Sequence, residues 1–221
     1  KSVLALADYY RALELGLGVC LRESVPMPLM SEPKGQTDAD TIGAVVFGSD
    51  QGLVGQFNDV VTDYAVKTLA ALPPKPEVWA VGEHVHARLA DAGLTPVGLF
   101  TVPNSVRAIT PLVGQILVEI GTRHGQDEAT ELHLFYNRPT SAADYACINQ
   151  RLLPLDEQWR RKLVEVPWPT GNLSEIMGDS TGTLRALIRE YLFVSLFRAC
   201  AESLASENAS RLAAMQRADK N

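Results

Sequence analysis

The stretch TIGAVVFGSDQGLVGQFN (41–58) decides the fold class of this chain. Its first eight residues (41–48) form a short apolar run between a linker and a glycine, which predicts a buried strand. A glycine-rich turn follows, and residues 57–72 then place apolar side chains on one helical face. A strand, a turn and a helix in this order are typical of α/β proteins.

The alternation of strands and helices continues after this stretch. Further strands are predicted at 77–81, 95–101, 131–137 and 145–155, and helices at 83–92 and 105–124. The connection between the last two strands is short and contains Pro139 and Ser141, so the fifth strand should run antiparallel to the fourth. We therefore expect a three-layer α/β/α body with a mostly parallel sheet and helices on both faces.

Helices are also predicted at both ends of the chain. In residues 2–23, apolar side chains that include Tyr10, Leu13 and Leu17 alternate three and four positions apart, which is a coiled-coil seam. No proline or glycine interrupts 183–221, which predicts one helix of about 60 Å starting near residue 181. Both helices carry heptads and bracket the α/β region, so we expect them to form an antiparallel pair.

The two halves of the last helix differ in their apolar pattern. Residues 181–197 are apolar over a wide arc and could equally pack on the sheet as a cover helix. In 205–221 the apolar arc shrinks to Leu212 and Met215 among alanines and charges. Packing on the sheet is therefore not expected there, and the last turns should project beyond a body with a radius of gyration of about 17 Å.

These patterns divide the chain into four parts. An N-terminal coiled-coil helix (1–24) precedes an α/β body (41–156), an irregular loop (157–180) and a C-terminal coiled-coil helix (181–221). The loop shows no periodicity and contains the sequence Pro167-Trp168-Pro169.

Composition excludes several classes of protein. The net charge of −6 argues against a general nucleic-acid binder, which would carry a basic face. No run of about 18 apolar residues exists, so we expect no insertion into a membrane. Cys20, Cys147 and Cys200 lie far apart without a CxxC motif, which favours free thiols in a cytoplasmic setting.

The turn after the first strand could in principle bind phosphate, because α/β proteins place phosphates at such helix N-termini. However, no lysine follows Gly55 as a P-loop requires, the GxGxxG spacing is absent, and Asp50 would repel phosphate. A structural turn is the favoured interpretation. A phosphate- or nucleotide-binding enzyme that uses Ser49–Gly55 remains the alternative.

Two other chemistries receive little support. Asp50 at the centre of a G-x-D-x-G turn resembles a nucleophile elbow, but the later histidines, His124 and His133, are predicted at a helix end and inside a strand. His84 and His86 are two apart on a predicted helix and point about 200° away from each other, so they cannot share an ion. No metal site and no cofactor are predicted.

Two segments are similar to the gamma subunit of F-type ATP synthases. The first is IGAVVFGSDQGLVGQFN (42–58), where the family reads roughly [ST]-D-[RK]-G-L-[CA]-G-[GA]-[FLY]-N. The second is 190–221, which contains a family pattern around ESLASENASRLAAM. The matching turn residues are Ser49, Asp50, Gly52, Leu53, Gly55, Phe57 and Asn58. Gln51 replaces the usual basic residue, as in a divergent branch such as an alternate ATPase.

This resemblance implies a fold and a function. The sheet should have five strands in the order 3-2-1-4-5 with strand 5 antiparallel, and the terminal helices should form an antiparallel coiled coil. The chain should be a non-catalytic rotor subunit of the central stalk, which couples ion-driven rotation of a membrane ring to catalytic sites on other subunits. The family's first helix begins further upstream and its last helix continues past Asn221, so the chain is expected to be trimmed to the globular part.

The resemblance also implies partners and interface residues. The partners would be the alpha and beta subunits, the epsilon subunit and the membrane c-ring, with the chain peripheral to the cytoplasmic face of a bacterial or archaeal membrane. Coiled-coil or interface positions are expected at Tyr10, Leu13, Leu17, Glu202, Ser206, Glu207, Arg211 and Met215. Pro167, Trp168 and Pro169 match no family motif and are a candidate ring or epsilon contact by position alone.

Overall fold

The computed structural model describes residues 2–23, 41–72, 75–124, 130–140, 144–172 and 174–220. The chain forms two compact units. The first contains residues 1–37 and 154–195, and the second contains residues 38–153 and 196–221. A single long helix, α6 (Ser180–Lys220), contributes residues to both units.

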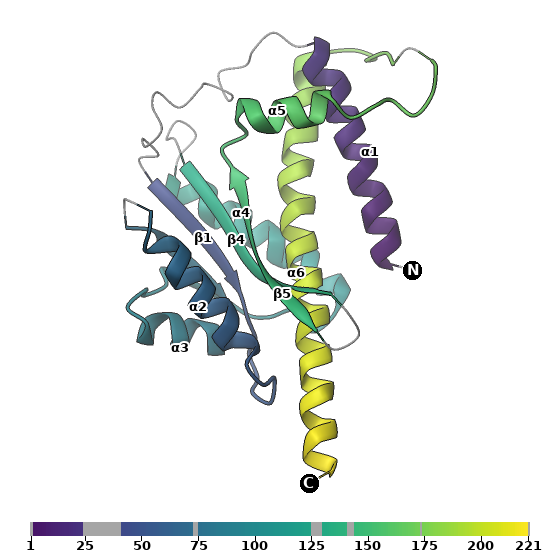
Figure 1. The fold of residues 1–221 in the computed structure, drawn as a ribbon. Coiled ribbons are helices and arrows are strands. Elements are labelled where there is room, and N and C mark those ends of the chain that lie inside the picture. The colour runs from purple at the N-terminus through teal and green to yellow at the C-terminus, as the bar shows by residue number, and fades with distance from the viewer. Residues whose placement is uncertain are drawn as a thin grey trace. The chain divides into compact units, whose positions relative to one another are not determined.

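The second unit is built around a five-stranded sheet (Figure 1). Its strands are β1 (Thr41–Phe47), β2 (Glu77–Val81), β3 (Gly98–Phe100), β4 (Thr130–Pro139) and β5 (Tyr145–Leu153). They lie in the order β3-β2-β1-β4-β5, and all neighbours are parallel except β4 and β5. The predicted strand order and the antiparallel fifth strand are confirmed.

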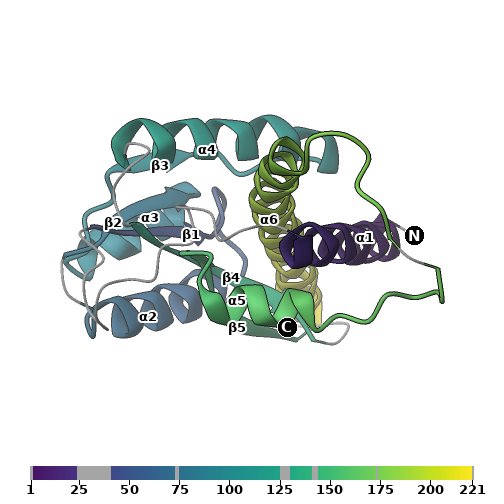
Figure 2. The same cartoon turned by 90° about the horizontal axis from the view of Figure 1, so that it is seen from above.

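Helices cover both faces of this sheet. On one side lie α2 (Phe57–Leu69) and α3 (Glu83–Asp91), and α4 (Ile109–His124) lies across the sheet from them (Figures 1 and 2). A 3₁₀ turn, Val106–Ala108, precedes α4 and takes up the start of the helix predicted from residue 105. The predicted α/β/α layering is confirmed.

The core of the second unit follows from the alternation of side chains along β1. Successive residues of a strand point to opposite faces, and β1 is the central strand, so both of its faces are buried. Side chains from β1, β2, α2 and α3 form one continuous cluster, with Phe135 from β4 at its edge. This cluster contains Ile42, Ala44, Val46, Val61, Ala65, Leu69, Val78, Ala80, Val85 and Leu89.

The third strand is shorter than predicted. Residues 95–101 were expected to form it, but only Gly98–Phe100 pair with β2. A Cβ atom on Gly98 would lie 2.6 Å from Cδ1 of Trp79 on the neighbouring strand. The glycine therefore lets the two backbones pair beside a large buried indole, and the pairing ends two residues later.

The first unit contains α1 (Ser2–Glu23), α5 (Glu157–Val164) and the start of α6. The Tyr10 and Tyr191 rings lie 5.9 Å apart, and Gly16 lies against Leu187. From the first contact to the second, the residue number rises in α1 and falls in α6, so the two helices run antiparallel. The predicted antiparallel pairing of the terminal helices is thus confirmed for this part of α6.

The interpretation of 157–180 as irregular is wrong in its first third. Glu157–Val164 form α5, which begins where the Asp156 carboxylate accepts a hydrogen bond of 2.9 Å from the Trp159 amide. At the other end, the Arg22 guanidinium donates hydrogen bonds to the carbonyls of Val164 and Val166. Both ends of this short helix are therefore satisfied, one locally and one from α1.

The expectation for the second half of α6 is also wrong. Residues 205–221 were not expected to pack on the sheet, but Ser206, Glu207 and Ser210 are buried within the second unit. Only the last part of the helix, from Met215 onwards, is exposed at every described side chain. Among the described residues, no helix combines the length and the hydrophobicity that crossing a bilayer would require.

Candidate functional site

The turn between β1 and α2 is held by reciprocal hydrogen bonds. The Ser49 amide donates to Oδ1 of Asn58 (3.0 Å), and Nδ2 of Asn58 donates to Oγ of Ser49 (2.8 Å). Both residues are at least 95% buried. The turn and the start of α2 are therefore fixed to each other, which explains why serine and asparagine are needed nine residues apart.

Asp50 joins this turn to two other loops. Its Oδ1 accepts a hydrogen bond of 3.0 Å from the amide of Glu83, the first residue of α3, and its Oδ2 accepts one of 2.8 Å from the amide of Val102 after β3. A carboxylate at a helix N-terminus is also favoured by the helix dipole. Asp50 therefore joins the carboxyl ends of three parallel strands through both of its carboxylate oxygens.

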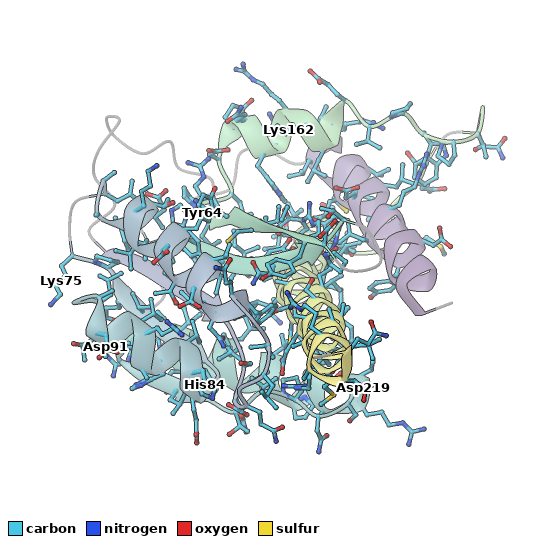
Figure 3. The ribbon with its side chains drawn as sticks, turned by 60° about the horizontal axis from the view of Figure 1, so that its bottom comes forward. Tyr64, Lys75, His84, Asp91, Lys162 and Asp219 are labelled. Atoms are coloured by element: carbon cyan, nitrogen blue, oxygen red, sulfur yellow. The ribbon has the colours of Figure 1, made fainter. Side chains whose placement is uncertain are left out.

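Among the histidines whose side chains are described, His133 lies away from this turn and His84 lies next to it. His133 is buried in β4 and lies between Oε1 of Glu131 (2.9 Å) and Oδ1 of Asn149 (2.8 Å). His84 lies on α3 (Figure 3), and its Nε2 would be 3.9 Å from a Cβ atom at Gly52. The side chain of His124 is outside the described residues. No group of three His, Cys, Asp or Glu side chains able to hold a metal ion occurs in the described ranges.

Two residues of the turn have left-handed backbone conformations. Gly55 has φ +58°, which glycine adopts without strain. Leu53 has φ +61° and is 75% exposed, an unusual combination for a large apolar residue. The tip of the turn is thus strained and apolar at the surface, while Val54 and Phe57 beside it are buried.

Three positions on α6 contact the end of the β4–β5 hairpin, and we call them the contact line: Glu202, Ser206 and Ser210. Oε2 of Glu202 accepts from Nε of Arg138 (2.8 Å), and Oγ of Ser206 donates to the carbonyl of Asn137 (3.0 Å). Ser210 is hydrogen-bonded to the hydroxyl of Tyr145. The three residues are four positions apart and therefore lie along one face of the helix.

The first contact of the line is part of a larger network. The other oxygen of Glu202, Oε1, accepts from Nε of Arg198 at 2.8 Å, so one carboxylate lies between two guanidinium groups. Nη2 of Arg138 also donates to the hydroxyl of Tyr136 at 2.6 Å. Burial raises the pKa of Tyr136, which keeps this phenol neutral at physiological pH.

Glu207 lies next to Ser206 of the contact line, on the polar side of α6 that packs in the second unit, and the residue is only 4% exposed. Its Oε1 accepts a hydrogen bond of 2.6 Å from Arg211, whereas its Oε2 has no partner among the described residues. Burial raises the pKa of Glu207, the Arg211 guanidinium opposes this shift, and the negative charge of Asp50 adds to it. The interface therefore contains a charge that is only partly compensated.

The remaining predicted interface residues divide between the two units. In the first unit, Leu13 and Leu17 are buried in α1. Trp168 is 38% exposed and lines an open pocket of about 460 Å³ together with Cys20 and Leu187. In the second unit, Met215 is 52% exposed on the last turns of α6.

Sequence reasoning missed the residues that receive the contact line. Asn137 and Tyr145 were predicted only as strand residues and Arg138 as part of the connection between the two strands, and none was identified as a site residue. The available signal was the change from apolar to polar residues at the end of β4, in YNRP (136–139), directly before the hairpin. Such a change also marks an ordinary strand end, so the sequence alone could not identify their role.

Comparisons with known proteins give one consistent result. The family model ATP-synt, described as ATP synthase, matches residues 1–221. An ATP synthase gamma chain from Synechococcus sp. (strain JA-3-3Ab) is 28% identical, covering 90% of this chain and 69% of the relative. One from Clavibacter sepedonicus is also 28% identical, covering 100% of this chain and 75% of the relative.

Solved structures show the same fold. The central stalk and c-ring structure of the Tetrahymena thermophila mitochondrial ATP synthase contains a chain that superposes with a TM-score of 0.61 at 19% identity. That match covers 99% of this chain and 100% of the other. A chain of the Euglena gracilis mitochondrial ATP synthase rotor superposes with a TM-score of 0.54 at 18% identity, covering 98% of this chain and 87% of the other.

Proposed function

The chain belongs to the ATP synthase family as one of its gamma chains, and we propose that it is a rotor subunit of the central stalk. In this role it couples ion-driven rotation of a membrane ring to conformational changes at catalytic sites on other subunits. The observation that carries the proposal is the match of the family model to all 221 residues. Both motif segments, the turn at 49–58 and the helix at 190–221, lie within that match.

The second part of the proposal is that the chain has no catalytic site of its own. The most reactive arrangement predicted from the sequence was the turn with Asp50 at its centre. Both oxygens of that carboxylate accept backbone hydrogen bonds, which supports a structural role for the turn. The nucleotide chemistry of the complex then takes place on the partner subunits.

The long helix supports a mechanical role. α6 has 41 residues and corresponds to about 60 Å of continuous helix at 1.5 Å per residue. A shaft has to transmit torque without bending, and sharp bends in helices need proline, glycine pairs or bulges. No proline or glycine follows Gly182 in this helix, so its sequence meets that requirement.

The proposed partners are the alpha and beta subunits, the epsilon subunit and the c-ring, with the complex on the cytoplasmic face of the membrane. We further propose Pro167, Trp168 and Pro169 as a contact for the ring or for epsilon. Their exposure and the pocket beside Trp168 support this assignment. Trp168→Ala should weaken binding of the ring or epsilon to the assembled stalk, and unchanged binding would remove this contact from the proposal.

Reconstitution tests the function itself. The gene that encodes this chain should be deleted and then complemented, and the purified complex should be assayed for ATP-driven rotation. We expect the chain to co-purify with alpha and beta subunits and to restore rotation. A complex that assembles and rotates equally well without the chain would overturn the proposal.

The alternative of a nucleotide-binding enzyme predicts a different result. Titration of the chain with ATP should then give saturable binding that a Gly52 substitution abolishes. Under the rotor proposal no saturable binding occurs. Isothermal titration calorimetry with the wild-type chain and a Gly52→Val variant separates the two functions.

A further inference from the structure

The buried face of α6 in the second unit is unusual for a helix that packs on a sheet. Its most buried residues are Leu196, Ala199, Cys200, Ser203, Ser206, Glu207 and Ser210. Among the described residues beyond Cys200, no large apolar side chain is buried on this face, and the buried residues there are serines and one glutamate. Burial of polar groups contributes little to folding stability by itself, so stability alone does not explain why this face is polar.

Small side chains provide little resistance to rotation of a helix about its own axis. Helices and sheets interlock when ridges of large side chains insert between those of the neighbouring element. Serine and alanine form low ridges, and apolar contact is not directional. Hydrogen bonds and ion pairs do have preferred geometry, so they can fix a rotational position that small side chains leave loose.

The contact line supplies such directional contacts at three levels of the helix. Glu202, Ser206 and Ser210 are spaced by about 6 Å along the axis and contact Arg138, Asn137 and Tyr145 respectively. A shift of one residue turns the helix by about 100°, which would break all three contacts together. Asn137 and Arg138 lie near the end of β4 and Tyr145 is the first residue of β5, where the hairpin strands pair with each other.

We propose that the contact line fixes the rotational position of α6 on the α/β body. Torque then passes between the body and the shaft at these three positions. This inference rests on the proposed rotor function and deepens it by assigning positioning residues. Apolar burial at Leu196 and Ala199 keeps the helix on the body, whereas the contact line fixes its angle. The two tasks are therefore separable by mutation.

The test uses the complete ATP synthase carrying the triple variant Glu202→Gln, Ser206→Ala and Ser210→Ala. Two quantities are measured in the same preparation, namely the rate of ATP hydrolysis and the number of ions transported for each ATP hydrolysed. The expected result is a loss of ions transported per ATP and a lower stall torque in single-molecule rotation. The matched control is Ser203→Ala, which changes a buried serine of the same helix outside the contact line. In this variant the number of ions transported for each ATP should stay at the wild-type value.

A second, milder variant keeps the test decisive if the triple variant does not assemble. Tyr145→Phe with Ser206→Ala removes only two hydroxyl groups, one from each side of the interface. It should lower the transport ratio less than the triple variant does. A wild-type ratio and stall torque in an assembled variant would overturn the inference, whereas a wild-type chain that supports no rotation would overturn the proposed function instead.

Discussion

Asp50 has a structural role that a single substitution can measure. Its two carboxylate oxygens accept hydrogen bonds from the amides of Glu83 and Val102, and Asp50→Ala leaves both amides without this acceptor. Hydrogen bonds to a charged group contribute about 1.5–3 kcal/mol each, reduced here by partial exposure. We expect a loss of about 2 kcal/mol in the free energy of unfolding, measured by urea denaturation. Gln51→Ala, at the exposed neighbouring position, should change it by less than about 0.5 kcal/mol.

Substitutions at Leu53 and Gly55 should change stability in opposite directions, because both residues have positive φ and only one is glycine. A non-glycine residue in this region costs about 1–2 kcal/mol, while glycine loses more entropy on folding. Leu53→Gly should therefore stabilise the fold by up to about 1 kcal/mol, and Gly55→Ala should destabilise it by about 1 kcal/mol. Thermal unfolding should give a higher midpoint for Leu53→Gly and a lower one for Gly55→Ala than for the wild type. A stabilised Gly55→Ala variant would contradict the backbone argument.

At the scale of elements, α1 contains two glycines, Gly16 and Gly18, whose surroundings differ. A Cβ at Gly18 would lie 2.6 Å from the carbonyl oxygen of Leu163 in α5, whereas one at Gly16 would lie 3.6 Å from Leu187 in ordinary contact. Gly16→Ala should therefore gain the helix propensity of alanine, about 0.8–1 kcal/mol. Gly18→Ala should destabilise the first unit, because α1 and α5 must separate. Circular dichroism during denaturation compares the two, and equal effects would contradict this account.

The polar interface of α6 predicts a pH dependence. Burial raises the pKa of Glu207 above that of the unfolded chain, so the folded state binds this proton more tightly. The contribution of Glu207 to stability is therefore fully present below the unfolded pKa and is lost as the pH rises through the folded pKa. In Glu207→Gln this loss is absent, so the difference in unfolding free energy between variant and wild type should shift in favour of the variant as the pH rises from 4 to 7. A difference that does not change over this range would show that the carboxylate titrates normally.

The order of elements could be predicted from the sequence because the spacing of apolar residues differs between strands and helices. The short connection before Tyr145 predicted an antiparallel last strand. The predictions failed where burial depends on a distant partner. Asp156, Glu157 and the basic residues Arg161 and Lys162 are the signals of a short helix, but they were overlooked inside a proline-containing segment. Serines at 203, 206 and 210 suggest a solvated face, and only the position of the β4–β5 hairpin shows that they are buried.

At the scale of the whole molecule, the three cysteines report on the two units separately. Cys20 belongs to the first unit, while Cys147 and Cys200 belong to the second. Burial raises the pKa of both Cys147 and Cys200 from 9.0 to about 12, so the reactive thiolate is about a thousandfold scarcer than in an exposed cysteine. None of the three cysteines forms a disulfide, and Cys20 and Cys200 are buried.

This protection makes the unfolding of each unit measurable in one experiment. Short pulses of iodoacetamide across a urea gradient, followed by peptide mass spectrometry, give the urea midpoint at which each thiol becomes reactive. Cys147 and Cys200 lie 53 positions apart in sequence but in one compact unit, so they should share a midpoint. Asp50→Ala should lower this shared midpoint more than that of Cys20, and Gly18→Ala should do the reverse, because each substitution affects contacts inside one unit only. If Cys147 followed Cys20 instead of Cys200 in both variants, the division of the chain into these two units would be wrong.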